Sequence, residues 1–228
     1  MGREGLAVVV GARTKEQVEA VATEVRGAGG EAVAVELDVT DPVSVEAAVA
    51  IAAALGPLDV LVNNAGIARA AGSARKFEDV VRSGKPGAAS LDEVRAVFET
   101  NVFGVIAVTQ AMLPLLREAP AGRIVNVSSS SGSLTLNADP AFPYRSVFGI
   151  YSASKTALNA ITLALAMELE PTRIKVNAAC PGFTSTDLNN FAGTRTVEQA
   201  AREPVRLALL GPDGPTGTFS DENGPIPW

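Results

Sequence analysis

The sequence contains Arg123-Ile124-Val125-Asn126-Val127-Ser128-Ser129, a β-branched run that ends in two serines. Such a run is typical of a buried strand. In open α/β sheets, ligands bind at the carboxyl ends of the strands. The stretch therefore predicts a core strand that delivers a serine hydroxyl to a binding edge, where it can hydrogen-bond a substrate carbonyl oxygen. Taken alone, Ser128 to Ser131 would be interpreted as a polar loop.

Short apolar runs and amphipathic stretches alternate on both sides of this strand. The predicted strands are 6–10, 31–37, 58–63, 123–128 and 173–178, and the predicted helices are 14–27, 41–55, 90–118, 151–169 and 196–210. This alternation predicts an α/β fold with a parallel sheet. No linker or repeat divides the chain, so residues 1–228 are expected to form one domain, with an irregular tail at 211–228.

Composition excludes several function classes. The net charge of −6 argues against a nucleic-acid surface and against anionic membranes. The chain has no histidine, which removes histidine-containing zinc sites and Ser-His-Asp hydrolysis, and no metal site is expected. Its single cysteine cannot form an internal disulfide. No apolar run approaches the ~20 residues of a membrane span and no signal-peptide pattern is visible, so a cytoplasmic protein is expected.

Tyr151 and Lys155 lie four residues apart on a predicted helix, which places a phenol and an ammonium on one face. A nearby ammonium favours the phenolate and lowers a phenol pKa from its usual value near ~10. Proton exchange with an alcohol or a carbonyl then becomes feasible at neutral pH. The simpler interpretation of this pair alone is a half-buried tyrosine beside a solvated lysine.

Asn101 falls in the middle of a predicted helix, where a polar amide beside an apolar face is locally unfavourable. Two interpretations stay open. The amide faces solvent or a neighbouring carbonyl, or it distorts the helix and holds a water molecule.

Taken together, these motifs resemble the short-chain dehydrogenase/reductase family. The resemblance covers the chain from about residue 6 to residue 186 and rests on Asn63-Asn64-Ala65-Gly66, Asn101-Val102-Phe103-Gly104, Ser128-Ser129, Tyr151-x-x-x-Lys155 and Pro181-Gly182. It implies a Rossmann-like, doubly wound parallel sheet. The tail, with Gly214-Pro215-Thr216-Gly217, is more weakly similar to the carbonyl-reductase and menthone-reductase branch.

The resemblance implies a role for each catalytic group. Tyr151 would be the general acid in reduction and the general base in oxidation. Lys155 would lower the pKa of Tyr151 and bind the nicotinamide ribose. Ser129 would orient the carbonyl, with Ser128 as the alternative if the register differs. Asn101 would hold the water of a proton relay.

The resemblance also implies which residues contact the cofactor. They are Asp38 and Val39 at the adenine, Asn64, Ala65 and Gly66 on the adenosine side, Tyr151 and Lys155 at the nicotinamide ribose, and Pro181, Gly182, Thr184 and Thr186 at the carboxamide. For Asp38 and Gly66 a plain turn role is the alternative interpretation.

Arg13 bears on the choice of cofactor. NAD-preferring enzymes place an acid near the end of the strand that corresponds to 6–10, where it bonds the ribose 2′-hydroxyl. After this strand, the first acid in the present sequence is Glu16. A guanidinium can bind a 2′-phosphate bidentately, so the sequence favours NADP(H) over NAD(H) with Arg13 as phosphate ligand. The alternative is a solvated arginine before a helix.

The family's usual first strand, glycine-rich turn and first helix have no counterpart in this sequence. The glycines at 27–30 follow a helix and precede a strand, which is the reverse of the required context. The strand at 6–10 instead corresponds to the family's second strand. We therefore expect a gap between the strands at 6–10 and 58–63, from a truncated chain or a sheet that has closed up differently.

The sequence thus predicts an NADP(H)-dependent oxidoreductase acting on a small carbonyl or alcohol. The alternatives are a noncatalytic binding or scaffold protein, an inactive truncated fragment and, less well supported, a nucleotide-sugar epimerase. The loops at 68–89 and 132–149 would shape the substrate pocket, and Phe142, Pro143, Tyr144 and Phe148 suggest an apolar lid and a hydrophobic substrate. The sequence leaves open whether the chain is a monomer or a homo-oligomer.

Overall fold

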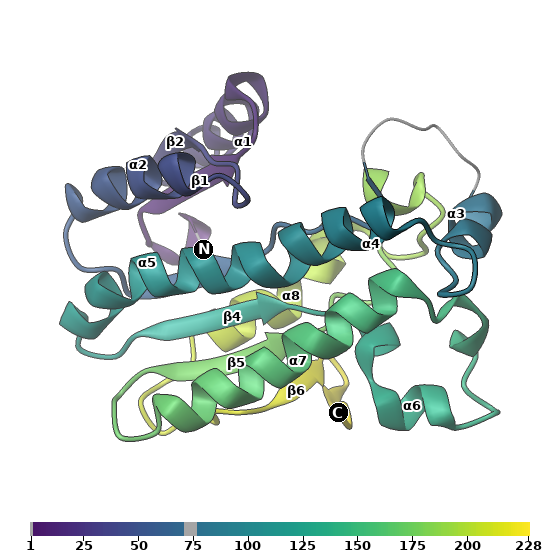
Figure 1. Cartoon of the computed structure of the whole chain (residues 1–228). Helices are drawn as coiled ribbons and strands as arrows, with labels where there is room; N and C mark the ends of the chain where they lie inside the picture. Colours follow the sequence, from purple (N-terminus) through teal and green to yellow (C-terminus); the bar gives the residue numbers. More distant parts are fainter. Residues whose placement is uncertain (1, 71–76) are drawn as a thin grey trace.

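The computed structural model describes residues 2–70 and 77–228. Strands and helices alternate along most of the chain (Figure 1). The strands are β1 (Val8–Ala12), β2 (Ala32–Glu36), β3 (Val60–Asn63), β4 (Arg123–Val127), β5 (Lys175–Ala179), β6 (Phe219–Asp221) and β7 (Gly224–Pro225). The helices are α1 (Lys15–Gly27), α2 (Pro42–Ala53), α3 (Phe77–Ser83), α4 (Leu91–Phe98), α5 (Gly104–Glu118), α6 (Leu134–Ala138), α7 (Ile150–Glu168) and α8 (Val197–Ala208). The predicted α/β class is confirmed.

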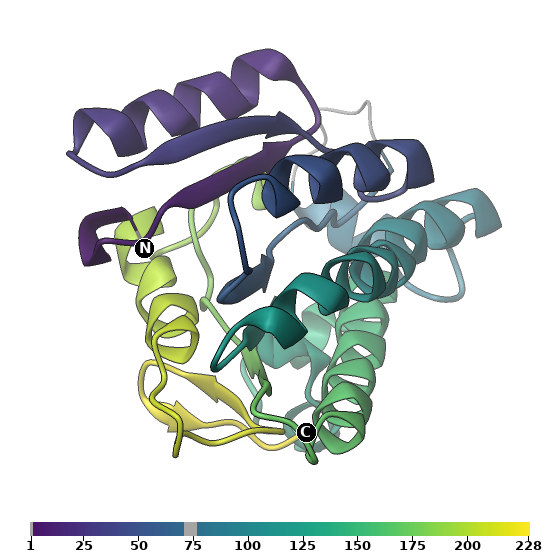
Figure 2. The same ribbon diagram turned by 90° about the vertical axis from the view of Figure 1, so that its left-hand side faces the viewer.

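The strands form two sheets. β3, β4, β5 and β6 pair in parallel in that order, and β7 closes the edge antiparallel to β6. β1 and β2 form a separate parallel pair, which Figure 2 shows beside α1 and apart from the larger sheet. Within the described residues, β1 and β3 are not paired with each other. The gap expected between these strands is therefore present, and the sheet has not closed up across it.

Local sequence signals start three of the helices as predicted. Thr14 accepts a hydrogen bond from the Gln17 amide at the start of α1. Asp41 and Ser90 cap α2 and α4 in the same way. Each cap satisfies a backbone N–H that the first helical turn leaves unpaired, so these starts follow from short-range chemistry.

Helices cover both faces of the larger sheet, as a doubly wound fold requires. α5 and α7 pack on one face, where Leu116, Ile124 and Val176 form a buried cluster. α8 packs on the other face, where Leu207 meets Val125. Burial on both faces explains why the strand sequences are nearly continuous apolar runs.

A chain of buried polar side chains crosses the same core. The Asn63 amide donates to Thr109 Oγ1 at 3.0 Å and to Asn126 Oδ1 at 2.8 Å. Asn126 in turn donates to Thr162 Oγ1 at 2.8 Å. These four residues join α5, β3, β4 and α7, and they are hydrogen-bonded to one another in a buried region.

The structure corrects three expectations about the outer segments. The tail at 211–228 is not irregular throughout, because β6 and β7 form a short hairpin that extends the sheet. The loops at 68–89 and 132–149 contain α3 and α6. Residues 71–76 of the first loop lie outside the described residues.

The continuous helical stretch Leu91–Glu118 is long and apolar enough to cross a membrane by length and composition alone, contrary to the sequence expectation. In the fold, its α5 portion packs against α2 and β3. It therefore behaves as the core helix of a globular domain.

Candidate active site

Tyr151 and Lys155 project from the first turns of α7 toward the carboxyl end of β4. Lys155 is 4% exposed, and its Nζ lies 5.8 Å from the centre of the Tyr151 ring. The same Nζ donates to the Val127 carbonyl oxygen at 2.8 Å. The i, i+4 spacing thus places both groups at the binding edge of the sheet, and the solvated-lysine interpretation is wrong.

Burial governs the protonation of both groups. Desolvation raises the pKa of the Tyr151 phenol; the nearby Cys180 thiol adds to this effect, while a hydrogen bond with Ser129 opposes it. Desolvation also lowers the pKa of Lys155 to about 8. The expectation that Lys155 lowers the pKa of Tyr151 is therefore not met in this structure, because both side chains lose solvation on burial.

The two candidate serines at the end of β4 face different ways. Ser128 is buried, and its hydroxyl donates to Asn159 Oδ1 on α7 at 2.5 Å. Ser129 is hydrogen-bonded to Tyr151, and its Oγ lies 3.0 Å from Ser131 Oγ. Of the two, Ser129 faces the phenol, and Ser128 contributes to the packing of α7.

Asn101 lies fully buried in a π-helical turn, Glu99–Phe103, that joins α4 to α5. Its Oδ1 accepts from the Ile67 amide at 2.8 Å, and its Nδ2 donates to Ile67 O and Ser154 Oγ, both at 2.9 Å. The helix is thus distorted at Asn101, and the solvent-facing interpretation is wrong. The amide holds the loop after β3 against α7.

Gly66 lies close to the Asn101 amide and to the Lys155 ammonium. A Cβ at Gly66 would come within 3.4 Å of both Asn101 Oδ1 and Lys155 Nζ. A Cβ there would therefore be in van der Waals contact with both of these side chains. Asn64 and Ala65, which precede it, are exposed.

Arg13 and Asp38 come together at the carboxyl ends of β1 and β2. Hydrogen bonds from the Thr40 hydroxyl and amide, with a smaller contribution from the Arg13 charge, lower the pKa of Asp38. The Asp38 carboxylate accepts from Thr40 at 2.7 and 2.9 Å, so it has the turn role considered from the sequence. Arg13 is exposed. Val39 packs against Gly104 at the start of α5.

The loop after β5 contains the remaining candidates. Gly182 has a φ of +74°, which favours glycine. Thr184 Oγ1 donates to the carbonyl oxygens of Pro181 and Gly182 at 3.3 and 3.2 Å. Thr186 caps the short 3-10 helix Asp187–Asn189. Both threonines are thus bonded within their own loop.

Two residues of the site were not singled out from the sequence. Cys180 lies at the end of β5, where its Sγ accepts from the Ser130 amide at 3.1 Å, and burial raises the pKa of its thiol. Ser154 bonds Asn101. Cys180 could have been found from the rule that ligand-binding residues follow parallel strands. Ser154 lies within the Tyr151–Lys155 motif but gives no separate signal.

The described residues fit the nicotinamide-ribose end of a dinucleotide. A buried ammonium, a phenol and a serine hydroxyl converge at the carboxyl end of β4, and the ammonium lies close to Gly66. No glycine-rich turn between a strand and a helix occurs in residues 2–70 or 77–228, so the described residues do not supply the usual pyrophosphate cradle.

Comparison with known proteins identifies the family. A family model described as short chain dehydrogenase matches residues 1–196. Salutaridine reductase from Papaver bracteatum is 33% identical over 82% of this chain and 76% of its own length. (−)-Isopiperitenone reductase from Mentha piperita is 34% identical over 81% of this chain and 77% of its own length. The crystal structure of NADPH-bound carbonyl reductase from chicken fatty liver matches with a TM-score of 0.77 at 26% identity, over 97% of this chain and 88% of that chain. This chain is therefore an oxidoreductase of the short-chain dehydrogenase/reductase family.

Proposed function

We propose that this protein uses NADP(H) to interconvert a hydrophobic carbonyl compound and its alcohol, with Tyr151 as the proton donor and acceptor. The observation that carries the proposal is the convergence of Tyr151, Ser129 and Lys155 at the carboxyl end of β4. Relatives are named salutaridine reductase and (−)-isopiperitenone reductase, and a structural relative is an NADPH-bound carbonyl reductase.

Each of these groups has a distinct task. NADPH, when bound, supplies the hydride. Tyr151 is held neutral by burial, which is the form that donates a proton to a developing alkoxide. Ser129 orients the carbonyl oxygen beside the phenol. The Lys155 ammonium would turn from the Val127 carbonyl toward the ribose hydroxyls.

Asn101 has a positioning role in this proposal. It fixes Ile67 and Ser154 on either side of the site. Its role in holding a relay water stays a prediction, and both Asn101 Oδ1 and Lys155 Nζ lie near Gly66.

Aromatic side chains next to the site favour an apolar substrate. The Phe142 and Tyr144 rings pack edge to face with centres 5.8 Å apart, and Tyr144 lies 6.2 Å from the Phe183 ring. This cluster joins the segment before α7 to the loop after β5. A lid of this kind excludes water and favours binding of a hydrophobic ketone or aldehyde, because its apolar surface is buried against the aromatic rings.

The cofactor preference can be tested through Arg13. We expect reduction of an aromatic ketone with NADPH to exceed that with NADH. Arg13→Ala should lower kcat/KM for NADPH about tenfold through loss of a charge-assisted hydrogen bond and leave the value for NADH unchanged. Arg117→Ala, which removes an exposed arginine on α5, is the control. Equal losses with both cofactors would contradict the assignment, and a chain that binds neither cofactor would favour the noncatalytic alternative.

The pH dependence of reduction follows from Lys155. Its pKa is lowered from 10.5 to about 8, so the ammonium is present below that pH and is lost above it. We expect kcat/KM for reduction to be level below about pH 8 and to fall above it. The Lys155→Arg variant, which stays charged, should be slower but should lose this fall. A wild-type rate that rises through pH 8 would contradict the prediction.

A further inference from the structure

The loop that follows β5 is held on one side by the segment before α8. The amides of Thr194 and Arg195 donate to the Phe183 carbonyl oxygen at 2.9 and 3.0 Å. The Ser185 amide donates to the Arg195 carbonyl oxygen at 2.9 Å. The two segments therefore run side by side in parallel, with Thr184 opposite Arg195.

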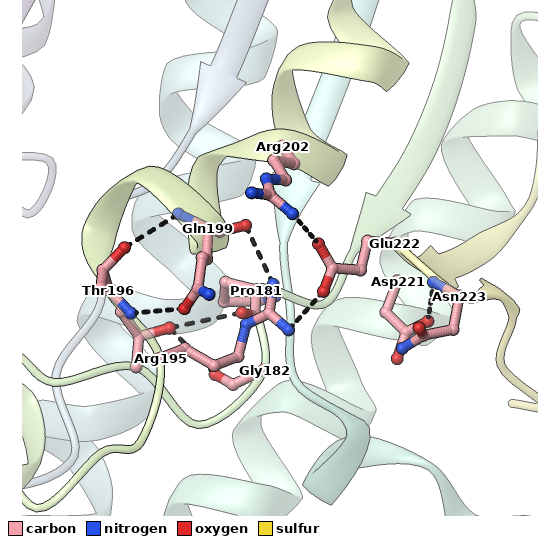
Figure 3. A network of polar contacts seen from close by, with 10 residues as sticks. Pro181, Gly182, Arg195, Thr196, Gln199, Arg202, Asp221, Glu222 and Asn223 are labelled. Atoms are coloured by element: carbon pink, nitrogen blue, oxygen red, sulfur yellow. Dashed lines mark hydrogen bonds and ion pairs between the residues drawn. The ribbon is translucent and has the colours of Figure 1, made fainter.

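The Arg195 side chain crosses the start of the same loop (Figure 3). A Cβ at Gly182 would lie 2.5 Å from Arg195 Cδ, so the aliphatic part of the arginine packs directly on the glycine backbone. Gly182 has a positive φ, and the packed arginine leaves no room for a side chain there. The loop is thus contacted by both the backbone and the side chain of Arg195.

The guanidinium of Arg195 is anchored outside the loop. Its Nη1 donates to Glu222 Oε1 at 2.6 Å and its Nη2 to the Gln199 carbonyl oxygen at 3.0 Å. Glu222 lies in the turn between β6 and β7, and Gln199 lies in the first turn of α8 (Figure 3). The Arg195 and Glu222 side chains are only 24% and 26% exposed, so this ion pair is better shielded than most surface pairs.

Arg202 provides an internal comparison. It also pairs with Glu222, at 3.4 Å, but its side chain is 65% exposed. Hydrogen bonding with Arg195 is the main reason that the pKa of Glu222 is lowered, and the pair is therefore charged at neutral pH. Both arginines share one anchor, but Arg195 is the one that packs on the loop.

We propose that Arg195, anchored by Glu222, is a positioning residue that holds Pro181–Thr184 in the conformation that receives the nicotinamide carboxamide. This inference rests on the proposed function, which places that carboxamide at the loop. It predicts that loss of Arg195 weakens binding of the nicotinamide half of NADPH and leaves the adenosine half untouched.

The first test measures the loop without cofactor. In the ligand-free chain, Arg195→Gln should speed hydrogen exchange at the Ser185 and Thr194 amides by at least about tenfold, because their pairing loses its anchor. Arg202→Gln removes the other cation that pairs with the Glu222 carboxylate, and the exchange rates of the two amides should stay as in the wild type. Exchange that is unchanged in Arg195→Gln, or raised equally in both variants, would overturn the role of Arg195.

The second test separates the two halves of the cofactor. Arg195→Gln should weaken binding of NADPH about tenfold while leaving the Kd for 2′,5′-ADP, which lacks nicotinamide, as in the wild type. Arg195→Lys should recover part of the NADPH affinity, and Arg202→Gln should change neither Kd. Equal weakening of both ligands would overturn the positioning role. A wild-type chain that binds neither ligand would overturn the proposed function and the carboxamide role with it, while the exchange data would still decide whether Arg195 holds the loop.

Discussion

Tyr151→Phe is expected to lower carbonyl turnover by about 10²- to 10⁴-fold, the usual range for loss of a general acid. The phenylalanine ring fills the same space, so the packing around α7 should be preserved. The Kd for NADPH should stay close to that of the wild type, because Lys155 and the loop after β5 remain. Steady-state rates and cofactor titration of the same preparation measure both quantities.

Tyr144→Phe is the matched control for this prediction, because the chain has only two tyrosines. Tyr144 is 46% exposed and lies in the aromatic cluster of the proposed lid. Its variant keeps the ring and should keep most of the turnover. Comparable losses in both variants would show that Tyr151 matters for packing and would refute its assignment as the proton donor.

Asn126→Leu is expected to destabilise the fold by about 2–4 kcal/mol, although leucine has a similar size. The substitution removes the acceptor of the Asn63 amide and the donor to Thr162, and both partners are buried with them. An unsatisfied buried amide costs its desolvation free energy in full. For a chain of this size the loss corresponds to a fall in Tm of about 6–12 °C, measurable by thermal or urea unfolding.

Two further variants make this prediction specific. Asn223→Leu changes an exposed residue and should alter stability by less than about 0.5 kcal/mol. The double variant Asn63→Leu/Asn126→Leu removes both partners of one bond and should lose less than the sum of the single losses. Strict additivity would contradict the coupling of these two amides across the sheet.

Much of the fold follows from short-range signals. The strands around Ile124 and Val176 are apolar runs whose residues are mostly buried, and the apolar run around Val8 forms the half-buried strand β1. Thr14, Asp41 and Ser90 start helices because their side chains satisfy amides two or three residues further on. The break between β1 and β3 was also expected, from the motif order that the family resemblance supplied.

The site was predicted less completely. The spacing of Tyr151 and Lys155 placed them on one helical face, and the position of the serines at a strand end placed them nearby. The family resemblance favoured Ser129 over Ser128, but local spacing did not, because the orientation of Ser128 depends on Asn159, which lies 31 residues away. Arg195 was passed over, since its partner Glu222 is 27 residues distant.

Local patterns in this chain thus account for its strands, its helix starts and the pairing of phenol with ammonium, since each depends on residues a few positions apart. Long-range packing settles the rest. It makes burial, rather than the lysine charge, the main influence on the pKa of Tyr151, and it aims Asn101 at Ile67 and Ser154. It also brings Arg195 to Glu222. The physical reason is that desolvation and the choice of hydrogen-bond partner depend on which distant segments are in contact. Residue spacing along one helix or strand does not specify those contacts.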